Sequence, residues 1–359
     1  MCKVIVISTV GIIYDGITSV ITSYLEAMNR ENIEFYVVST IKSEVKIEKK
    51  LKKIGCHIVY LPSRRNHPIR YFWGLLNFIR ENKIEVMHAH GNSATLSIEL
   101  VAGFLGGCKK RIAHSHNTRC DQIKIDKLLR PIFNIFYTDA LACGEEAGKW
   151  LFRDRNFIVL KNGRDVEKYL FSEITRNRIR QRFNLSDKLI IGHVGGFFEQ
   201  KNHRFLIEIF RKILKMRPDA RLFLIGDGPL KEEIQSSVED IKEYVIFTGT
   251  VDCVGDYLQA MDGMILPSLF EGLPLVVIEW QINGLPSLLS DRITSSCKIT
   301  DMVEFQSLEV DCNLWAEKVL NMIDRSNRKK DSVVATRLVK EKGFDIKDNA
   351  GILRRIYLS

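Results

Sequence analysis

Short runs of β-branched and aliphatic residues alternate with helical patterns along most of this sequence, and this alternation strongly constrains the fold. Such βα repeats place parallel strands in a sheet that helices cover on both faces. A first series of strands is expected at 3–8, 34–40, 57–61, 85–90, 111–115, 139–143 and 157–160. After an arginine-rich helix the series restarts, with strands expected at 189–194, 221–226, 244–249, 263–267 and 286–290. The chain is therefore predicted to form two successive α/β units.

The length of 359 residues suits two domains of ordinary size. We expect a first domain at 1–165, a second at 166–342, and a C-terminal helix at 343–359 that can pack back on the first domain. Ligands of open α/β sheets bind beyond the carboxyl ends of the strands. The predicted site therefore lies in a cleft between the two domains.

The composition is typical of a soluble cytoplasmic protein. Hydrophobic residues make up 45% of the chain, yet no apolar run approaches the roughly 20 residues needed to cross a bilayer. The apolar start has no basic flank beyond Lys3, so it predicts a buried strand and not a secretory signal. The eight cysteines form no CxxC pair, which favours reduced thiols over disulfides or a zinc site.

Basic residues lie beside aromatic and aliphatic ones in two segments, 63–80 and 109–137. This combination suits an anionic surface and predicts a peripheral protein on the inner face of the cell membrane. Helices with a solvated basic face and a buried apolar face would explain the same pattern, and this alternative stays open. The net charge of +9 would also suit nucleic acid, but no nucleic-acid-binding motif appears, so no such partner is expected.

The stretch PSLFEGLPLVVIEW, residues 267–280, begins at the end of an expected strand and continues into an expected helix. Pro274 is predicted to be the first helical residue, where its missing N–H would have had no partner. The amides of Gly272 and Leu273 would then lie at the positive end of the helix dipole. Such a helix start is a natural site for a phosphate.

Two acids stand near the ends of this otherwise apolar stretch. Glu271 can accept hydrogen bonds from the hydroxyls of a sugar, and Glu279 can accept them from the two hydroxyls of a ribose. A helix-capping acid and an exposed helical acid would be the simpler interpretation if the motif stood alone. Other motifs in the chain favour the sugar interpretation.

Three further turns between a strand and a helix are rich in glycine, and each could present backbone amides to a phosphate. Lys201, in the stretch 192–205, is placed to meet a diphosphate and to stabilise the charge that develops on a leaving nucleoside diphosphate. Each turn alone is a weak signal, whereas four together indicate a diphosphate site. The candidate donor-binding residues in these turns are Gly16, Gly195, Gly196, Lys201, Asn202, Gly226 and Gly228.

Together these motifs resemble the retaining glycosyltransferases of family 4, which have two Rossmann-like domains facing a cleft in the GT-B arrangement. The likeness rests on Glu271 and Glu279 in the family's E-x7-E pattern, on GHVG, QKN and GDGP in the second domain, and on KNGRDVEKY at the hinge. RIAHSHNT, ACGEEAGKWLF and SDRITSSCKIT are similar to members that build bacterial capsular polysaccharides and exopolysaccharides.

The resemblance implies transfer of a hexose or an N-acetylhexosamine from a UDP-sugar to a polyprenyl-diphosphate-linked glycan precursor. It also implies that His116, Glu271 and Lys201 act in catalysis, with His116 beside the reacting sugar. Lys201 and helix amides would hold the diphosphate, so no cofactor and no divalent metal ion is expected.

The chain departs from the family pattern at two positions. An arginine usually follows GHVG, where this chain has Gly196, and Gly-Gly usually occupies the first-domain turn, where it has Asp15 and Gly16. Loss of an arginine–phosphate contact would weaken donor binding by about 1.5–3 kcal/mol. Another basic residue, such as Arg204, could compensate. Without compensation, the chain would be a slow enzyme or a non-catalytic partner of another transferase that binds nucleotide or membrane.

Two other chemistries stay open. A nucleotide-sugar epimerase of the same fold would share the diphosphate site. The pairs HAH (88–90) and HSH (114–116) each put two imidazoles on one side of a strand, as zinc-dependent hydrolases do. No HExxH motif or acid cluster completes a metal set. Hydrogen-bonded residues at strand ends are therefore the favoured interpretation of His88, His90 and His114.

Overall fold

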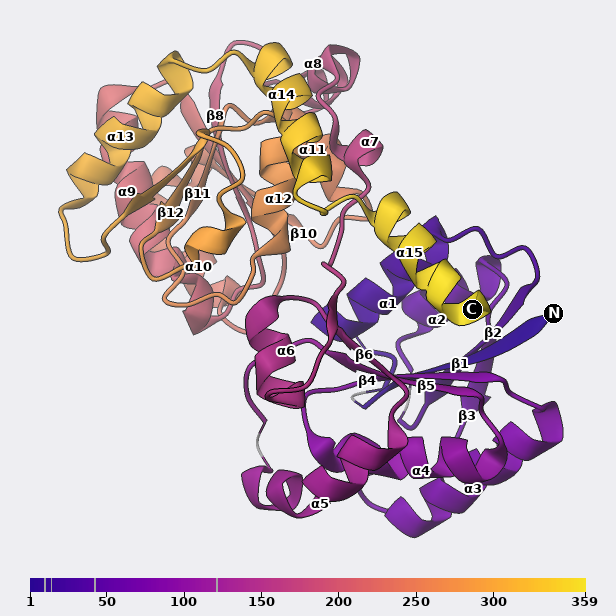
Figure 1. Ribbon diagram of the computed structural model, residues 1–359. Coiled ribbons are helices and arrows are strands. Elements are labelled where there is room, and N and C mark those ends of the chain that lie inside the picture. Colours follow the sequence, from indigo (N-terminus) through magenta and orange to yellow (C-terminus); the bar gives the residue numbers. More distant parts are fainter. Residues whose placement is uncertain (10, 14, 42, 121) are drawn as a thin grey trace. The chain divides into compact units, whose positions relative to one another are not determined.

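The computed structural model describes residues 1–9, 11–13, 15–41, 43–120 and 122–359, and it divides the chain into two compact units. Unit 1 comprises Met1–Gly163 together with Ile346–Ser359, and unit 2 comprises Arg164–Asp345 (Figure 1). The last helix of the chain thus belongs to the unit formed by the first half of the sequence. Among the described residues, no helix is long and apolar enough to span a membrane.

Unit 1 is built on a seven-stranded sheet in the order β3-β2-β1-β4-β5-β6-β7. All neighbouring strands run parallel, as the βα repeats predict. The strand order reverses between β1 and β4, so the loops that follow these two strands diverge and leave room for a ligand. The strands are β1 (Cys2–Ser8), β2 (Ile33–Ser39), β3 (His57–Tyr60), β4 (Val86–His90), β5 (Lys110–Ser115), β6 (Asp139–Ala142) and β7 (Ile158–Val159).

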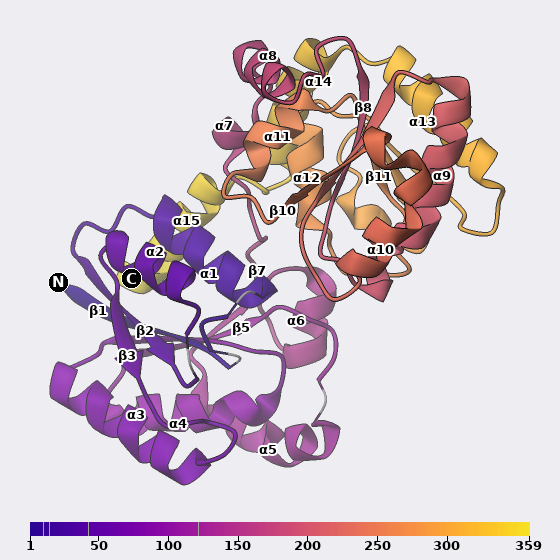
Figure 2. The ribbon, with the colours of Figure 1, turned by 180° about the vertical axis from the view of Figure 1, so that it is seen from behind.

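Helices cover both faces of this sheet because apolar side chains alternate between the two faces along each strand. Val4 and Val6 pack on the side of α1, α2 and α15, whereas Ile5 and Ile7 pack against α3 and α4. Figure 2 shows the first group of helices above the strands and α3, α4 and α5 below them. The helices are α1 (Gly16–Ala27), α2 (Val45–Lys53), α3 (Pro68–Asn82), α4 (Ser97–Gly106), α5 (Ile123–Phe136), α6 (Glu145–Phe152) and α15 (Ile346–Leu358), with a 3-10 turn η1 (Ala94–Leu96) before α4.

Unit 2 repeats this architecture with a six-stranded parallel sheet in the order β10-β9-β8-β11-β12-β13. The order reverses between β8 and β11. The strands are β8 (Leu189–Val194), β9 (Ala220–Ile225), β10 (Val245–Gly249), β11 (Gly263–Leu266), β12 (Ser287–Ser290) and β13 (Val303–Gln306). β13 was not predicted, because half of its residues are polar and it pairs only with β12 at the sheet edge.

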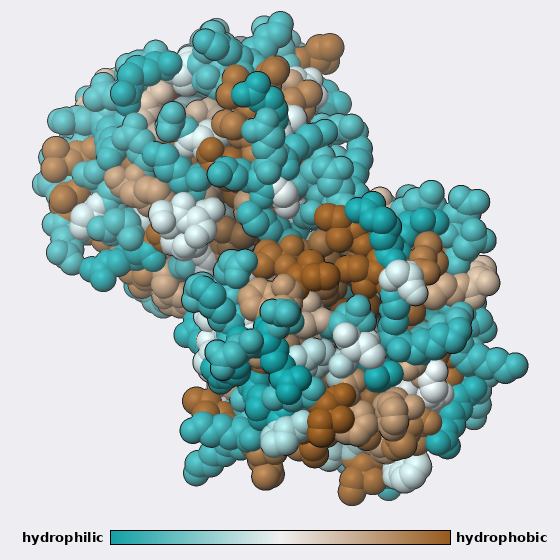
Figure 3. Space-filling view, in the orientation of Figure 1, coloured by the Kyte–Doolittle hydropathy of each residue, from teal (hydrophilic) through white to brown (hydrophobic). Residues whose placement is uncertain are grey.

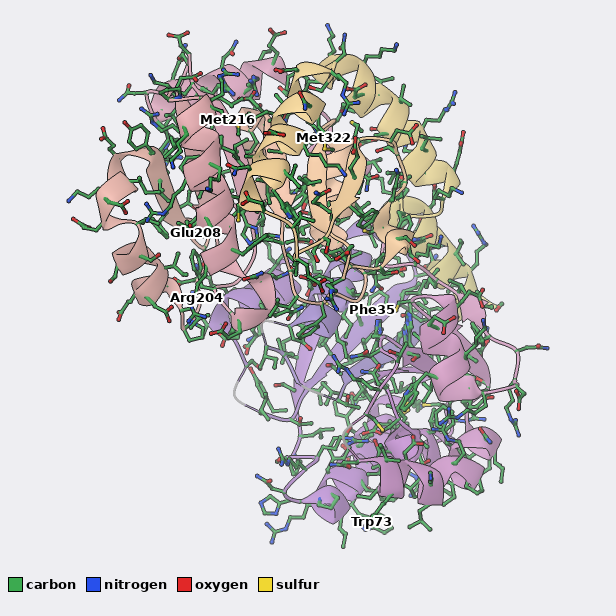
Figure 4. The ribbon with its side chains drawn as sticks, turned by 90° about the vertical axis from the view of Figure 1, so that its left-hand side faces the viewer. Phe35, Trp73, Arg204, Glu208, Met216 and Met322 are labelled. Carbon is green, nitrogen blue, oxygen red and sulfur yellow. The ribbon has the colours of Figure 1, made fainter. Side chains whose placement is uncertain are left out.

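The helices of unit 2 also lie on both faces of the sheet. α9 and α13 pack together on one face, and Figure 4 shows them side by side with Met216 and Met322 labelled. α8, α11, α12 and α14 pack on the other face around the buried Trp280. The helices are α7 (Val166–Tyr169), α8 (Glu173–Arg182), α9 (His203–Met216), α10 (Lys231–Ser237), α11 (Val254–Ala260), α12 (Leu275–Ile282), α13 (Cys312–Asp324) and α14 (Arg328–Glu341), with 3-10 turns η2 (Glu199–Lys201), η3 (Glu239–Tyr244) and η4 (Ser295–Cys297).

The predicted fold class is confirmed. Each unit has the doubly wound strand order of a Rossmann-like domain, and the chain contains two such units. The boundary lies between Gly163 and Arg164, two residues before the expected position. The reversal points at β1/β4 and β8/β11 are the places where the fold itself positions a ligand site.

Candidate active site

Lys201 and Glu271 meet at the reversal point of the unit 2 sheet. Lys201 follows β8, Glu271 follows β11, and Lys201 Nζ lies 2.5 Å from Glu271 Oε1. The hydroxyl of Ser268, which is fully buried, donates a second hydrogen bond of 2.9 Å to the same oxygen. Only 17% of the Lys201 side chain and 10% of the Glu271 side chain are exposed. Two of the three predicted catalytic residues therefore form one largely desolvated ion pair.

The loops after β8 and β11 are held together by hydrogen bonds independent of this pair. The amide of Leu269 donates to Gln200 O (2.8 Å), and the side chain of Gln200 donates to Phe270 O (2.9 Å). Asn202, predicted to bind the donor, instead donates its side-chain amide to Pro267 O (3.2 Å). Its positive φ of 56° ends the turn that carries Lys201, so in this structure Asn202 ties the two loops together.

Two of the predicted donor-binding glycines have a structural reason in this fold. Gly226 and Gly228 have φ of +147° and +159°, and a Cβ at these positions would lie 2.1 Å from Gly195 O and 2.7 Å from Phe197 N. The GDGP turn thus packs its backbone directly against the turn after β8. Both glycines are required for this contact, whether or not a ligand binds nearby.

Gly195 and Gly196 lie in the turn that Lys201 crosses. A Cβ at position 195 would lie 3.2 Å from Lys201 Cδ and 3.1 Å from His193 Nε2, so the absent side chain leaves the path of Lys201 open. A Cβ at position 196 would lie 2.6 Å from the ring of Phe198. A larger residue at position 196 would therefore require the Phe198 ring to move.

His193 belongs to this site, although the sequence patterns did not single it out. It is fully buried at the end of β8, and its Nδ1 is bonded to the carbonyl oxygen of Ile265 (2.9 Å). Burial, with a smaller contribution from His203, holds its pKa well below 6.5. Its Nε2 is enclosed and has no hydrogen-bond partner in the described part of the chain. A polar residue at the end of an otherwise apolar strand was the available signal.

The helix start after Glu271 differs from the prediction. Pro274 is the N-cap residue with extended backbone, and the first helical residue is Leu275. Gly272 and Leu273 lie in the bend before the cap, so their amides are not part of the first helical turn. The prediction that Pro274 opens the helix was therefore wrong by one residue. Proline fixes φ but not ψ, and the chain here turns at ψ 98° before the helix begins.

Glu279 is buried and forms an ion pair with Arg164, whose Nε lies 2.6 Å from Glu279 Oε1. Tyr169 is a further neighbour, and burial together with the Glu279 charge raises the pKa of its hydroxyl. From its place in the motif, Glu279 was expected to be available to a ribose. In the structure Arg164, from the segment at the unit boundary, already engages one of its oxygens.

Arg204 does not supply the missing arginine of the Lys201 site. It projects from the first turn of α9 (Figure 4) and pairs with Glu233 (2.7 Å) and Glu199 (3.1 Å). More than half of its side chain is exposed. The suggestion that Arg204 replaces the family arginine therefore finds no support in this arrangement.

In unit 1, Gly16 is the first residue of α1, and Asp15 is its N-cap. The Asp15 carboxylate accepts a hydrogen bond of 2.8 Å from the amide of Thr18. Apart from its chain neighbours and the backbone of its own helix, no described residue has a heavy atom within 4 Å of the place where a Gly16 Cβ would stand. Asp15 thus stabilises the helix and, at the same time, puts a negative charge at its start.

His116 lies beside His88, His90 and His114 at the carboxyl ends of β4 and β5, and we refer to these four residues as the histidine cluster. His90 Nδ1 lies 2.8 Å from His116 Nε2, and His88 Nε2 lies 3.1 Å from His114 Nδ1. Burial lowers the pKa of His116 to about 4 and those of the other three well below 6.5. All four imidazoles are therefore neutral at pH 7 and hydrogen-bonded. Hydrogen bonding was the favoured interpretation of His88, His90 and His114.

Comparison with known proteins identifies the chemistry of unit 2. Residues 188–325, which include β8, Lys201, Glu271 and Glu279, match the family described as glycosyl transferases group 1. A Bacillus subtilis protein named as the glycosyltransferase EpsF is 29% identical over 95% of this chain and 93% of its own length. The UDP-Gal:alpha-D-GlcNAc-diphosphoundecaprenol alpha-1,3-galactosyltransferase of Escherichia coli is 24% identical over 71% of this chain and 73% of its own.

Solved structures bear out the fold. Anabaena Alr3699/HepE in complex with UDP superposes with a TM-score of 0.79 at 14% identity, over 99% of both chains. The structure of its complex with UDP-glucose superposes with a TM-score of 0.76, again over 99% of both chains. These likenesses show the fold alone. The family match in unit 2 and the sequence relatives identify the chain as a glycosyltransferase.

Proposed function

We propose that the protein is a retaining glycosyltransferase that moves a hexose or an N-acetylhexosamine from a UDP-sugar to a polyprenyl-diphosphate-linked glycan. The observation that carries this proposal is the Lys201–Glu271 ion pair at the reversal point of the unit 2 sheet. Transfer from a nucleotide sugar requires a cation for the diphosphate beside an acceptor for the sugar hydroxyls. Lys201 and Glu271 supply both within 2.5 Å of one another.

The donor and acceptor are proposed from the chemistry of the relatives. HepE shares this fold and binds UDP and UDP-glucose, which supports a UDP-linked donor. The Escherichia coli relative acts on a sugar carried by diphosphoundecaprenol, which supports a polyprenyl-linked acceptor. A Staphylococcus aureus relative, 23% identical over 93% of this chain, is named as the capsular polysaccharide biosynthesis glycosyltransferase CapH. This name supports capsule or exopolysaccharide biosynthesis as the proposed role.

In the proposed reaction, Lys201 stabilises the negative charge that develops on the β-phosphate as the bond from C1 to the phosphate oxygen breaks. The bond from the acceptor oxygen to C1 forms on the same face. The leaving phosphate oxygen takes the proton of the acceptor hydroxyl, so the products are UDP and the extended glycan. Glu271 orients the sugar, Glu279 binds the ribose, and His116 lies beside the sugar. No side chain acts as a nucleophile, and no step needs a divalent metal.

The direct test is turnover of radiolabelled UDP-sugars with a synthetic polyprenyl-diphosphate-linked acceptor, in the presence and absence of EDTA. We expect transfer that depends on the acceptor, is insensitive to EDTA, and is lost in Glu271→Ala. A thermal-shift screen of UDP-, GDP- and dTDP-sugars selects the donor, because a tight ligand stabilises the folded state. Conversion of the UDP-sugar without an acceptor would instead identify an epimerase, and equal turnover by Glu271→Ala would exclude the proposed site.

Asp15→Asn is expected to tighten UDP binding by about two- to fivefold, the effect of one charge near a helix N-terminus. Asparagine keeps the cap on Thr18 but removes the negative charge beside the amides of α1. Isothermal titration with UDP measures the change. The matched control is Asp311→Asn, which alters the N-cap of α13 in the same way and should leave UDP affinity unchanged. Weaker binding by Asp15→Asn would show that α1 does not hold the diphosphate.

The membrane proposal rests on an exposed apolar surface of unit 1. Ile125, Leu128, Ile132 and Ile135 recur at helical spacing along α5, and all four are exposed, Leu128 by 76%. Figure 3 shows brown side chains among teal ones along the lower edge of the molecule, over α3, α4 and α5. Figure 4 shows Trp73 at the outer side of α3. The exposed apolar residues of the three helices are Ile69, Trp73, Phe104, Leu105, Ile123, Ile125, Leu128, Ile132 and Ile135.

The charges around this surface favour an anionic bilayer as its occupant. Lys124 and Lys127 are exposed on α5 between the apolar residues. Arg111 and Arg130, which also belong to the basic segment 109–137, turn inward instead. Arg130 pairs with Asp126 (2.5 Å), and Arg111 donates to the carbonyl of Phe136 (2.7 Å). The surface is therefore less basic than the sequence suggested, and its apolar residues supply most of the proposed affinity.

Leu128→Asp combined with Ile132→Asp is expected to weaken binding to phosphatidylglycerol vesicles by at least about tenfold, since two apolar side chains are lost from the bilayer. Cosedimentation with vesicles measures the fraction of protein that is bound. The difference in binding between phosphatidylglycerol vesicles and uncharged phosphatidylcholine vesicles reports the electrostatic contribution to the affinity. Ile174→Asp in α8 is the matched control, because Ile174 is 84% exposed but lies in unit 2. Unchanged sedimentation of the double variant would exclude this surface as the membrane contact.

A further inference from the structure

Tyr357 of α15 ends a hydrogen-bonded chain through the histidine cluster. Its hydroxyl lies 2.6 Å from His88 Nδ1, and His88 Nε2 lies 3.1 Å from His114 Nδ1. Tyr357, His88 and His114 are at most 3% exposed. Although Tyr357 stands 269 positions after His88 in the sequence, the last helix brings it to the carboxyl ends of the central strands of unit 1.

The proton positions along this chain follow from the groups that can donate. Burial raises the pKa of Tyr357 well above 10, so its hydroxyl keeps its proton. Burial also lowers the pKa values of His88 and His114 well below 6.5, so each imidazole is neutral and carries one N–H. Among the described residues, the Tyr357 hydroxyl has one hydrogen-bond partner, His88 Nδ1. A phenol hydroxyl is a stronger donor than an imidazole N–H, and an imidazole nitrogen is the stronger acceptor, so donation by the hydroxyl is the favoured direction. His88 then holds its proton on Nε2 and donates it to His114 Nδ1. His114 must therefore hold its own proton on Nε2.

This arrangement leaves a donor enclosed in the protein without an acceptor. His114 Nε2 is buried and has no hydrogen-bond partner among the described residues, and the same holds for Nδ1 of the neighbouring His116. The two rings are stacked with centroids 4.3 Å apart. An unpaired buried N–H is unfavourable in the folded state, so this place is suited to an oxygen atom of a ligand.

We propose that Tyr357 is a positioning residue that sets the tautomers of His88 and His114, so that His114 Nε2–H donates a hydrogen bond to a hydroxyl oxygen of a bound sugar. This inference rests on the proposed function, which supplies the sugar. The hydroxyl belongs either to the transferred sugar or to the acceptor glycan, and the kinetics below separate the two. Tyr357 touches neither substrate and acts through His88.

The geometry of the histidines favours the hydrogen bonds from Tyr357 through His88 to His114 over a metal site. One nitrogen each of His88, His90 and His114 lies within 4.8 Å of the others, which is a spacing that a metal could draw together. However, His88 and His114 have their rings only 2° from parallel, with the two nitrogens facing each other at 3.1 Å. A hydrogen bond needs one lone pair opposite one N–H, as here, whereas zinc needs both lone pairs directed at a third point.

The first test is the tautomeric state of the histidines in the full-length protein. Nitrogen-15 NMR of the imidazole rings at pH 7.5 distinguishes an Nε2–H ring from an Nδ1–H ring without any substrate. We expect Nε2–H for His88 and His114 in the wild type. In Tyr357→Phe, where His88 Nδ1 loses its donor, we expect a shift of both rings toward Nδ1–H. An Nδ1–H ring at His114 in the wild type, or unchanged shifts in the variant, would overturn the proposal.

Tyr24→Phe is the matched control, because Tyr24 is another buried tyrosine of unit 1 whose hydroxyl donates to Lys161 O (2.7 Å). Both variants lose one buried hydroxyl and should lose comparable thermal stability, but only Tyr357→Phe should change the histidine tautomers. Stoichiometric binding of added zinc, with metal-type nitrogen shifts in the cluster, would also overturn the proposal.

The second test is steady-state kinetics of Tyr357→Phe with the UDP-sugar and acceptor that the wild type uses. Loss of a correctly oriented donor is expected to lower kcat/KM by about two- to tenfold for the substrate whose hydroxyl His114 binds. If kcat/KM falls only for the UDP-sugar, the hydroxyl that His114 binds belongs to the transferred sugar. If kcat/KM falls only for the acceptor, that hydroxyl belongs to the acceptor glycan. Unchanged kinetics beside shifted tautomers would refute the sugar contact. Absence of any transfer by the wild type would refute the proposed function instead, while the tautomer result would stand separately.

Discussion

Replacing Lys201 with methionine is expected to lower kcat/KM for the UDP-sugar by about 10²–10³-fold, the usual effect of removing one group that stabilises charge in a transition state. Methionine keeps most of the apolar stem that crosses Gly195 but removes the cation. The charge that develops on the leaving diphosphate then has no ammonium group beside it. Initial rates at varied donor concentration measure the effect.

The same substitution has a predictable effect on stability. Glu271 is about one-tenth exposed, so without Lys201 its charge keeps, among the side chains that the structure describes, only the hydrogen bond from Ser268. We expect a loss of about 3 kcal/mol, the lower end of the range for breaking a buried ion pair. The double variant Lys201→Met/Glu271→Gln has no unpaired charge, so it should recover much of this stability while staying inactive.

This double-mutant cycle separates folding from catalysis. Urea unfolding reports the stability of the wild type, both single variants and the double variant, and transfer assays report their activity. Lys201→Arg is a further control that retains a cation at the position. Wild-type turnover by the folded Lys201→Met variant would contradict the assignment of Lys201 to the diphosphate.

Gly226→Ala is expected to destabilise unit 2 by about 3 kcal/mol or more, because overpacking and a strained backbone conformation both contribute. The new Cβ would lie 2.1 Å from Gly195 O at a φ of +147°. The backbone fixes the position of a Cβ, and the Gly195 oxygen is itself a backbone atom, so no side-chain rotation can relieve the clash. The turn after β8 would have to shift, and Lys201 would shift with it. Hydrogen exchange of residues 189–225 and the urea midpoint measure the loss.

Gly272→Ala provides the matched control for this prediction. Apart from its two chain neighbours, no residue in the described part of the chain has a heavy atom within 4 Å of the place of its Cβ, and its backbone does not adopt a positive φ. A change of less than about 0.5 kcal/mol is expected, as for surface substitutions away from special features. Equal stability of the two variants would show that the GDGP turn does not pack against the turn after β8 as described.

Local patterns in the sequence predicted most of the secondary structure. The expected strands at 3–8 and 189–194 appear as Cys2–Ser8 and Leu189–Val194, because runs of β-branched residues specify buried parallel strands without reference to the rest of the chain. The edge strand Val303–Gln306 escaped notice because it lacks such a run. The start of α12 was misplaced by one residue, since a proline fits both the cap and the first helical position.

The site was predicted as a set of residues but not as an arrangement. The motifs named Lys201, Glu271, Glu279 and His116 as functional residues without indicating their partners. The carboxylate of Glu279 is engaged by Arg164, and Asp15 serves first as the cap of α1. Gly226 and Gly228 serve the packing of two turns. Motif matching identifies residue types, whereas these roles depend on the atoms that surround them.

The sequence by itself determined the two α/β units, the parallel strands and the polar residues that follow them, since periodicity and turn chemistry act over a few neighbouring residues. Tertiary structure alone decided which of those residues meet. Lys201 reaches Glu271 across 70 positions, Arg164 reaches Glu279 across 115, and His88 reaches Tyr357 across 269. Such pairs form because the strand order reverses at the centre of each sheet and the last helix returns to the first unit. Both are properties of the folded chain that no local pattern specifies.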